Sequence, residues 1–311
     1  MYIGVDLGGT NIAIGIVSDN GEILIKDSTP TIKERPIEEI VADMAKLINK
    51  LCDDYGITLD DISGVGIGSP GTIDFNTGVV VLSNNLRMKN YPIADALSKL
   101  INKPVKVDND ANCAAMGEYV ASKVEADDFI LITLGTGVGS GIIANGQMVR
   151  GFNGAAGEAG HMTIVCNGEQ CTCGKRGCWE TYASVTALIR QTKEAMEKNP
   201  ESLMNEIATR DGKVSGRTAF EAAKAGDKAG KTVVENYRMY IAEGLINMIN
   251  IFQPKVVAIG GGISREGEYL LAPIREYVLN NNYNKFLEMP EIVTAKLMGD
   301  AGIVGAAMIA K

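Results

Sequence analysis

The segment "FILITLGTGVGSGIIANGQMV", residues 129–149, passes from an apolar run through a glycine-rich turn into a second apolar run, and then through Asn145-Gly146 into a third. Residues 2–24, "YIGVDLGGTNIAIGIVSDNGEIL", follow the same order, with Asn20-Gly21 as their second turn. Short apolar runs bounded by turn residues predict buried strands, and Asn-Gly favours tight hairpins. The two segments lie roughly 125 residues apart and predict two copies of one α/β domain plan facing each other across a cleft.

Length and composition favour a soluble protein with two domains. The chain has 311 residues, of which 46% are hydrophobic and 22% charged, and 311 residues exceed one comfortable core. We expect a smaller N-terminal domain at 1–115 plus about 297–311, and a larger C-terminal domain at 116–296. No apolar run approaches the about 20 residues of a membrane helix, and the N-terminus lacks signal-peptide features, so we expect a cytoplasmic protein without a membrane partner. The net charge of −8 argues against nucleic-acid binding.

The remaining chain reads as alternating helices and strands. Residues 37–56 have helical spacing, residues 105–120 read as a strand leading straight into a helix, and 301–311 as a helix of small residues. Residues 200–218 are polar and broken, which predicts an irregular surface segment. The literal G-x-G-x-x-G at 66–71 contains Pro70 and leads into a hairpin pattern, and "AGDKAGKT" at 225–232 lies in a helical pattern, so neither is interpreted as a nucleotide fingerprint.

A second feature is the clustering of soft metal ligands. The only histidine, His161, is followed after ten, twelve and seventeen residues by Cys171, Cys173 and Cys178. Three thiolates and one imidazole form a closed tetrahedral zinc set, so we predict structural Zn²⁺ rather than a hydrolytic site. The alternatives are free thiols in a loop or a disulfide. A metal-stiffened loop should hold its polar neighbours in place, namely Glu158 and Glu180.

Three glycine turns follow predicted strands and could hold a nucleotide. Backbone amides in such turns approach anions closely, and Asp6 at a strand end is well placed to orient hydrated Mg²⁺. Each turn taken alone could be an ordinary hairpin or helix entry. The candidate nucleotide-binding residues are Asp6, Gly8, Gly9, Thr10, Asn11, Gly135, Thr136, Gly137, Gly260, Gly261 and Gly262.

The stretch "VDNDAN", residues 107–112, holds the best catalytic candidate. Asp110 stands at a predicted strand end just before a helix, where amide dipoles favour a carboxylate. The alternative is a helix N-cap, a common position for Asp and Asn. Its place at the carboxyl end of a strand in the expected cleft supports a functional role.

These pieces together resemble the ROK family of sugar kinases and repressors. "DLGGTN", "GSPGTID", "SNNL", "DNDAN", "LGTGVGSG", "GEAGH", "CTCGKRGCWE" and "AIGGGIS" occur in the family's order across the whole chain. The resemblance is strongest to bacterial ROK glucokinases. It implies an actin-like, ribonuclease-H-like pair of domains (the ASKHA kinase fold), with ATP against the glycine turns and a sugar between the domains.

The resemblance also implies roles for individual residues. Asp110 resembles the general base that takes the proton from the 6-hydroxyl of the sugar. His161 would serve both the zinc and the sugar. The implied substrate-binding residues are Ser69, Pro70, Gly71, Asn85, Asn109, Asp110, Glu158, His161 and Glu180. The implied cofactors are ATP, Mg²⁺ and structural Zn²⁺, and the implied assembly is a homodimer or homotetramer.

One departure bears on the substrate. After "SNNL" the chain has Arg87-Met88-Lys89, where many family glucokinases carry Asn and Trp. We therefore expect a glucokinase, with a kinase for N-acetylmannosamine, N-acetylglucosamine or fructose as the alternative. A sugar-sensing regulator is a further alternative, but family repressors carry a helix-turn-helix ahead of the first glycine turn, which here begins at residue 6. The last alternative is a zinc-stabilised binding protein that does not turn over a substrate. The intact "DNDAN" motif argues against it.

Overall fold

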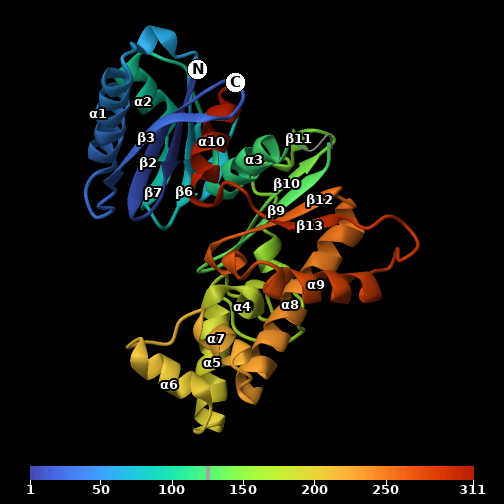
Figure 1. Cartoon of the computed structure of the whole chain (residues 1–311). Helices are drawn as coiled ribbons and strands as arrows, with labels where there is room; N and C mark the ends of the chain where they lie inside the picture. Colours follow the sequence, from blue (N-terminus) through green and yellow to red (C-terminus); the bar gives the residue numbers. More distant parts are fainter. Residues whose placement is uncertain (124–126) are drawn as a thin grey trace. The chain divides into compact units, whose positions relative to one another are not determined.

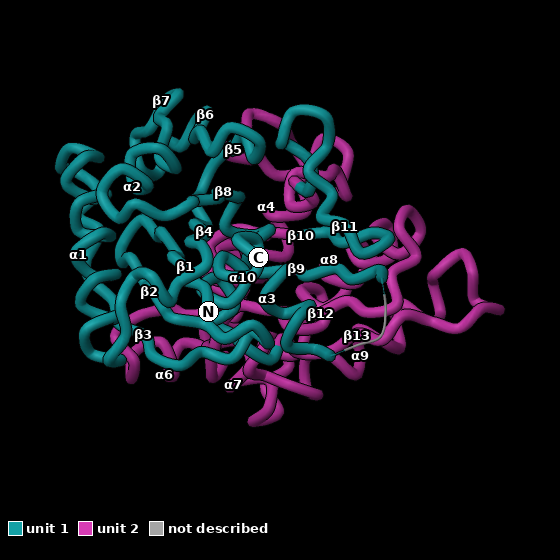
Figure 2. The backbone as a smooth tube through the Cα atoms, turned by 90° about the horizontal axis from the view of Figure 1, so that it is seen from above, with its two compact units in different colours: residues 1–131, 141–157, 296–311 teal, residues 132–140, 158–295 magenta. Residues whose placement is uncertain are grey.

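The computed structural model describes residues 1–123 and 127–311 and groups them into two compact units (Figure 2). Unit 1 comprises Met1–Leu131, Gly141–Gly157 and Lys296–Lys311, and unit 2 comprises Ile132–Ser140 and Glu158–Ala295. The domain bounds drawn from the sequence stay a prediction. Among the described helices, none combines the length and apolar character that a bilayer crossing requires.

The central sheet of unit 1 has the order β3-β2-β1-β4-β8. Its strands are β1 (Tyr2–Leu7), β2 (Asn11–Val17), β3 (Ile23–Pro30), β4 (Gly64–Ser69) and β8 (Val105–Asn109). The first three pair antiparallel as consecutive hairpins, as the sequence predicted, whereas β1, β4 and β8 run parallel. The carboxyl ends of the three parallel strands therefore lie at one edge of the sheet.

Helices cover both faces of this sheet (Figure 1). Helices α1 (Ile37–Tyr55) and α2 (Ile93–Ile101) pack together over one face. On the other face, α10 (Ala301–Ile309) packs on α3 (Asp110–Ser122) and on β1 and β4. This approach requires glycine in the sheet, because a Cβ at Gly4 would lie 1.8 Å from a carbonyl oxygen of α10. The predicted C-terminal helix closing onto the first domain is thereby confirmed.

A small antiparallel sheet follows β4 in unit 1. It consists of β5 (Thr72–Asp74), β6 (Val79–Ser83) and β7 (Met88–Tyr91), in that order. The segment that matched a dinucleotide fingerprint therefore leads into a hairpin rather than a helix, as its proline indicated.

The second five-stranded sheet has the order β11-β10-β9-β12-β13. Its strands are β9 (Phe129–Leu134), β10 (Val138–Ala144), β11 (Gln147–Met148), β12 (Val256–Gly260) and β13 (Glu291–Thr294). The division into units passes through β9 and β10. The predicted strand–turn–strand–turn–strand repeat is confirmed, since β9, β10 and β11 follow the chain order of β1, β2 and β3.

The rest of unit 2 is mainly helical. Its α-helices are α4 (Glu180–Ala183), α5 (Val185–Lys198), α6 (Leu203–Arg210), α7 (Thr218–Lys224), α8 (Lys228–Phe252) and α9 (Glu268–Asn281). The prediction of an irregular segment at residues 200–218 is wrong for α6. Ser202 caps that helix, and its two inward residues, Met204 and Ile207, are buried, which is enough to hold a polar two-turn helix.

Candidate active site

Two carboxylates gather at the carboxyl edge of the unit 1 sheet. Asp6 of β1 is in register with Gly68 of β4, and Gly68 is in register with Asp108 of β8, two residues before Asp110. Burial, and then the negative charge of Asp110, raises the pKa of Asp6 to about 6. Burial also raises the pKa of Asp110. A half-buried Asp6 that is repelled by the charge of an exposed Asp110 is suited to binding a cation or a proton.

The N-cap of α3 is Asn109 rather than Asp110. The Asn109 Oδ1 accepts hydrogen bonds from the backbone amides of Ala111 and Asn112 at 2.8 and 3.3 Å. Asp110 is the first residue of the helix, and its carboxylate accepts a hydrogen bond from the Ala111 amide at 2.9 Å. The capping role that the sequence left open for Asp110 is therefore filled by its neighbour, and the carboxylate is left for another role.

The other predicted sugar-binding residues of unit 1 differ in how they are held: Asn109 and Ser69 make hydrogen bonds to the Pro70-Gly71 turn, whereas Asn85 is exposed. The Asn109 side-chain amide donates to the carbonyl oxygen of Gly71 at 3.1 Å, which joins the helix cap to the Pro70-Gly71 turn. Ser69 is fully buried, with its hydroxyl directed to the Pro70 carbonyl at 3.5 Å. Asn85 is exposed in the turn between β6 and β7.

A buried ion pair supports the strand end that precedes Asp110. Asp108 is 2% exposed and accepts hydrogen bonds from Arg150 Nε at 2.8 Å and from the Asn112 side chain at 2.9 Å. The Asn109 amide also donates to it at 2.8 Å, and the Arg150 guanidinium lies over the Phe75 ring at 3.8 Å. The sequence analysis did not identify Arg150, because a single arginine after a strand carries no pattern. Asp108 stood inside the quoted "VDNDAN" without a role.

The first glycine turn is small and firmly braced. The Gly8 amide donates to the Asn11 carbonyl at 2.9 Å, and the fully buried Thr31 donates its hydroxyl to the Gly8 carbonyl at 2.7 Å. A side chain at Gly9 would meet nothing within 4 Å, and Thr10 is exposed. The turn therefore presents open backbone next to the half-buried Asp6, as an anion-binding turn requires.

In unit 2 the other two glycine turns lie against each other. Gly261, with φ of 88°, approaches the end of β9 so closely that a Cβ would lie 2.1 Å from the Leu134 carbonyl oxygen. Residues 135–137 follow directly, closed by a hydrogen bond from the Gly135 amide to the Gly137 carbonyl at 3.0 Å. The structure thus brings together two segments that the sequence places more than a hundred residues apart.

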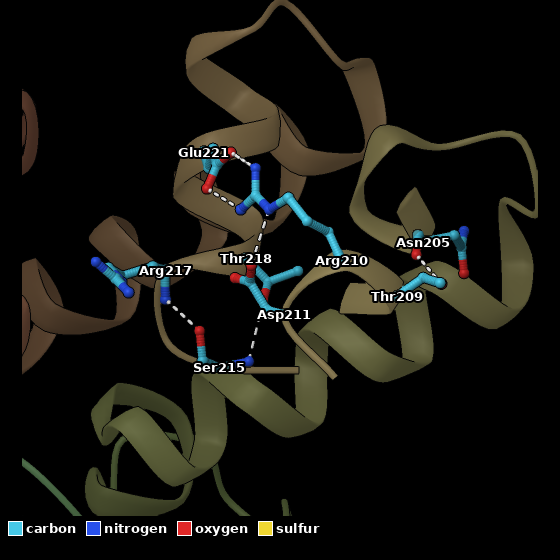
Figure 3. A network of polar contacts seen from close by, with 8 residues as sticks. All are labelled: Asn205, Thr209, Arg210, Asp211, Ser215, Arg217, Thr218 and Glu221. Carbon is cyan, nitrogen blue, oxygen red and sulfur yellow. Dashed lines mark hydrogen bonds and ion pairs between the residues drawn. The ribbon is translucent and has the colours of Figure 1, made fainter. Parts of the chain in front are cut away.

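A pocket of about 750 Å³ opens beside these turns. It is lined by Val185, Asp211, Lys213, Ser215, Gly216, Arg217, Gly262, Ile263, Arg265 and Glu266. Val185 donates its amide to the Gly135 carbonyl at 2.8 Å, which fixes the pocket to the glycine turn. Figure 3 shows how the 210–221 segment is held. Arg210 bridges Asp211 and Glu221, and the Arg217 amide donates to the Ser215 hydroxyl. Apart from Gly262, the sequence analysis named none of these residues.

The predicted metal ligands converge. The ligand atoms of His161, Cys171, Cys173 and Cys178 all lie within 4.8 Å of one another. Cys171 Sγ is 3.6 Å from His161 Nδ1, and Cys173 Sγ is 3.6 Å from Cys178 Sγ. Since Zn–S bonds are about 2.3 Å, two sulfurs of a tetrahedral zinc site lie about 3.8 Å apart, so the donor set fits Zn²⁺. We call residues 161–178 the metal loop.

The metal loop adjoins the three polar residues predicted to hold a sugar. His161 Nδ1 faces Cys171, which leaves Nε2 without a partner among the described residues. The Glu180 carboxylate accepts the Val138 amide at 3.1 Å and fills the space that a side chain at Gly137 would occupy. Glu158 is exposed, one residue before the short helix Ala159–His161. Unit 2 thus joins the metal site, a glycine turn and these polar groups.

Comparison with known proteins is consistent with these features. The model of the ROK family matches residues 2–311. The chain is 38% identical to a glucokinase of Thermotoga maritima, over 99% of this chain and 96% of that protein. The crystal structure of a ROK family glucokinase from Streptomyces griseus in complex with glucose and AMPPNP aligns with a TM-score of 0.81 and 36% identity, covering 99% and 98% of the two chains. A xylose repressor of Caldicellulosiruptor bescii is 31% identical, over 97% of this chain and 76% of the repressor.

Proposed function

The chain belongs to the ROK family and has its sugar-kinase fold, and on that premise we propose that it is an ATP-dependent glucokinase that phosphorylates the 6-hydroxyl of glucose. The observation that carries the proposal is the placement of Asp110, a solvent-accessible carboxylate whose charge acts on Asp6 at the carboxyl edge of three parallel strands. We further propose that the enzyme is cytoplasmic and acts as a homodimer or homotetramer.

Asp110 is the proposed general base. Its raised pKa makes it a better proton acceptor than an ordinary carboxylate. It accepts the proton of the 6-hydroxyl as that oxygen attacks the terminal phosphorus of ATP. Phosphoryl transfer requires little covalent chemistry from the protein, so positioning and charge balance supply most of the catalysis. Asn109, held by its bond to Gly71, would orient the neighbouring hydroxyls.

The nucleotide is proposed to occupy the glycine turns. The pocket beside Gly262 has the volume of a small-molecule site, and its Ser215, Lys213 and Arg217 suit the hydroxyls and charges of a nucleotide. The open turn at Gly9 and Thr10 would take phosphate oxygens through backbone amides. Asp6 is the residue placed to hold hydrated Mg²⁺, and the ion when bound would neutralise phosphate charge.

The metal loop is proposed to hold one side of the sugar pocket. His161 would hold Zn²⁺ through Nδ1 and would offer Nε2 to a sugar hydroxyl, and Glu180 follows the last cysteine of the proposed ligand set by two residues. Metal coordination fixes the tautomer and the direction of the imidazole. Glu158 and Glu180 would accept hydrogen bonds from hydroxyls at the anomeric end of the sugar. Because a metal-bound loop would already restrict these two side chains, ordering them on sugar binding would cost less entropy.

The decisive experiment is a coupled ADP assay with a panel of sugars, using wild type and Asp110→Asn. We expect glucose to be the best substrate and the variant to lose roughly 10²- to 10⁴-fold in kcat, with unchanged circular dichroism. The panel includes N-acetylmannosamine, N-acetylglucosamine and fructose, because Arg87, Met88 and Lys89 border the proposed sugar site. Near-normal turnover by Asp110→Asn would contradict the mechanism, and turnover of another sugar alone would correct the substrate.

A further inference from the structure

A second cavity lies in unit 2, lined by residues other than those given a role above. It has a volume of about 530 Å³, lies along helices α5 and α8, and also meets Tyr182 of α4 and Glu169 of the metal loop. Small-molecule sites commonly enclose about 300–1,000 Å³. None of its lining residues belongs to the proposed glucose, ATP, Mg²⁺ or Zn²⁺ sites. We call it the α5–α8 cavity.

The walls of the α5–α8 cavity carry a positive surplus. Three cationic side chains, Arg190, Lys198 and Lys228, stand against two carboxylates, Glu169 and Glu194. Both carboxylates pair with Arg190, at 3.7 and 2.7 Å. Lys198 and Lys228 are exposed, and within the described chain neither takes part in an ion pair. In a chain with a net charge of −8, such a hollow is a local attractor for a small anion.

The two lysines come from different helices. Lys198 is the last residue of α5 and Lys228 is the first residue of α8. The amide of Gly230 in the first turn of α8 is already taken by the Asp227 cap at 2.6 Å. The anion would therefore be held by the ammonium groups and would link the ends of the two helices.

The floor of the cavity suits a polyol. The rings of Tyr182 and Tyr240 lie 4.8 Å apart and offer apolar surface, and the Asn236 amide, which also lines the cavity, adds both donors and an acceptor. A ligand with an anionic end and a hydroxylated body satisfies both parts of the wall. Phosphorylated sugars and polyols have this chemistry.

The same floor leads to the proposed sugar-binding residue Glu180. The Tyr182 hydroxyl accepts the Glu169 amide at 2.7 Å, and Trp179 donates its indole N–H to the Tyr240 carbonyl at 2.7 Å. Glu180 and Tyr182 belong to the same four-residue helix α4, between these two anchors. A ligand that draws α5 and α8 together over Tyr182 would therefore steady the Glu180 carboxylate.

We propose that the α5–α8 cavity is a regulatory site for a small phosphorylated sugar or polyol, with the phosphate on Lys198 and Lys228 and a bound ligand raising sugar affinity through α4. The site itself stands on the cavity and its charges, whereas the effect on sugar affinity rests on the proposed function. It is separate from the reaction site, since no residue is shared.

The test uses isothermal titration calorimetry with glucose 6-phosphate and with inorganic phosphate. It compares wild type, Lys198→Ala/Lys228→Ala, and the matched control Lys193→Ala/Lys231→Ala, which removes one exposed lysine from each helix outside the cavity. We expect the cavity variant to bind the sugar phosphate at least about tenfold more weakly, because two charge-assisted contacts are lost, and the control to bind as wild type. Phosphate alone should bind more weakly than the sugar phosphate.

Kinetics supply the second readout. We expect the sugar phosphate to lower the sugar KM of wild type and control at unchanged kcat, and to leave the cavity variant's KM unchanged. Equal binding by all three proteins, or no binding at millimolar ligand, overturns the proposal. The proposal is also overturned if sedimentation velocity shows that the cavity variant no longer self-associates, because the cavity would then be a contact with a second copy of the chain. Lysine-dependent binding without sugar turnover would refute the proposed function while leaving the site intact.

Discussion

Replacing Arg150 by methionine should reduce both the stability of the protein and its turnover. The substitution keeps an unbranched side chain over the Phe75 ring but removes the cation that faces Asp108 at 2.8 Å through both Nε and Nη2. Asp108 is 2% exposed and would remain as a buried charge with only the Asn109 amide and the Asn112 side chain as donors. Breaking a buried pair in this way costs about 3–5 kcal/mol of unfolding free energy.

The effect on turnover follows from the position of the pair. The residues bonded to Asp108 flank Asp110, so relaxation of the unpaired carboxylate would displace the base. A shift of about 1 Å in a reacting group can cost roughly 10²-fold in rate. We expect Arg150→Met to lower kcat by about 10- to 100-fold, with a smaller change in the ATP KM.

Urea unfolding followed by circular dichroism, together with steady-state kinetics, measures both effects. Asp108→Asn and the double variant Asp108→Asn/Arg150→Met complete a double-mutant cycle, in which the double variant should lose less than the sum of the singles. Lys46→Met, which breaks the exposed pair of Lys46 with Asp43, is the matched control and should cost under about 1 kcal/mol. A loss by Arg150→Met as small as the control's, with normal kcat, would refute the reasoning.

Three further predictions concern the metal, Asp6 and Glu118. Stripping the metal with a chelator should raise the sugar KM and lower the melting temperature, both restored by Zn²⁺; a purified protein free of zinc and insensitive to chelation would contradict this. Asp6→Asn should abolish turnover yet stabilise the ligand-free protein at pH 7 by up to about 3 kcal/mol, because a pKa raised from 3.8 to about 6 disfavours folding with the carboxyl ionised. This penalty builds up as pH rises from about 4 to about 6, so urea unfolding at pH 4 should show a difference of under about 1 kcal/mol between the two proteins. Glu118 is 2% exposed and accepts hydrogen bonds from the backbone amides of Lys296, Leu297 and Met298 at 2.6, 2.8 and 3.1 Å. Glu118→Ala should therefore lower the unfolding free energy by about 3 kcal/mol or more in the same urea assay. A loss below about 1 kcal/mol would mean that these amides find other partners.

Local patterns in the sequence predicted most elements of the fold. Asn-Gly turns and apolar runs were sufficient for both hairpin repeats, because turn chemistry and strand burial act within a few residues. The metal ligands were predictable for the same reason, since spacing and residue type alone restrict a tetrahedral set. Helix α6 was missed because only Met204 and Ile207 carry its apolar face, and their burial comes from tertiary packing.

Long-range contacts could not be predicted from the sequence. The pairing of Arg150 with Asp108 joins residues 42 apart in the chain and has no periodic signal. The pocket beside Gly262 depends on residues 211–217, whose polarity alone indicated an exposed loop. Asp110 was correctly placed at a strand end, but only the structure shows that Asn109, rather than Asp110, takes the helix cap.

The proposed metal site would explain why His161 and three of the cysteines are gathered in one place. Apart from two isolated bridges, Thr163 with Cys178 and Gln170 with Arg176, the metal loop has no strand of its own and few buried side chains. A segment with so little core gains little stability from hydrophobic burial, and coordination of the proposed metal would supply the missing free energy. Trp179, fully buried, then anchors the end of the loop to α8, where a side chain at Gly244 would lie 1.9 Å from its ring. Glu180 follows directly, so a bound metal on one side and the packed indole on the other would hold its carboxylate rigidly, as its proposed role in sugar binding requires.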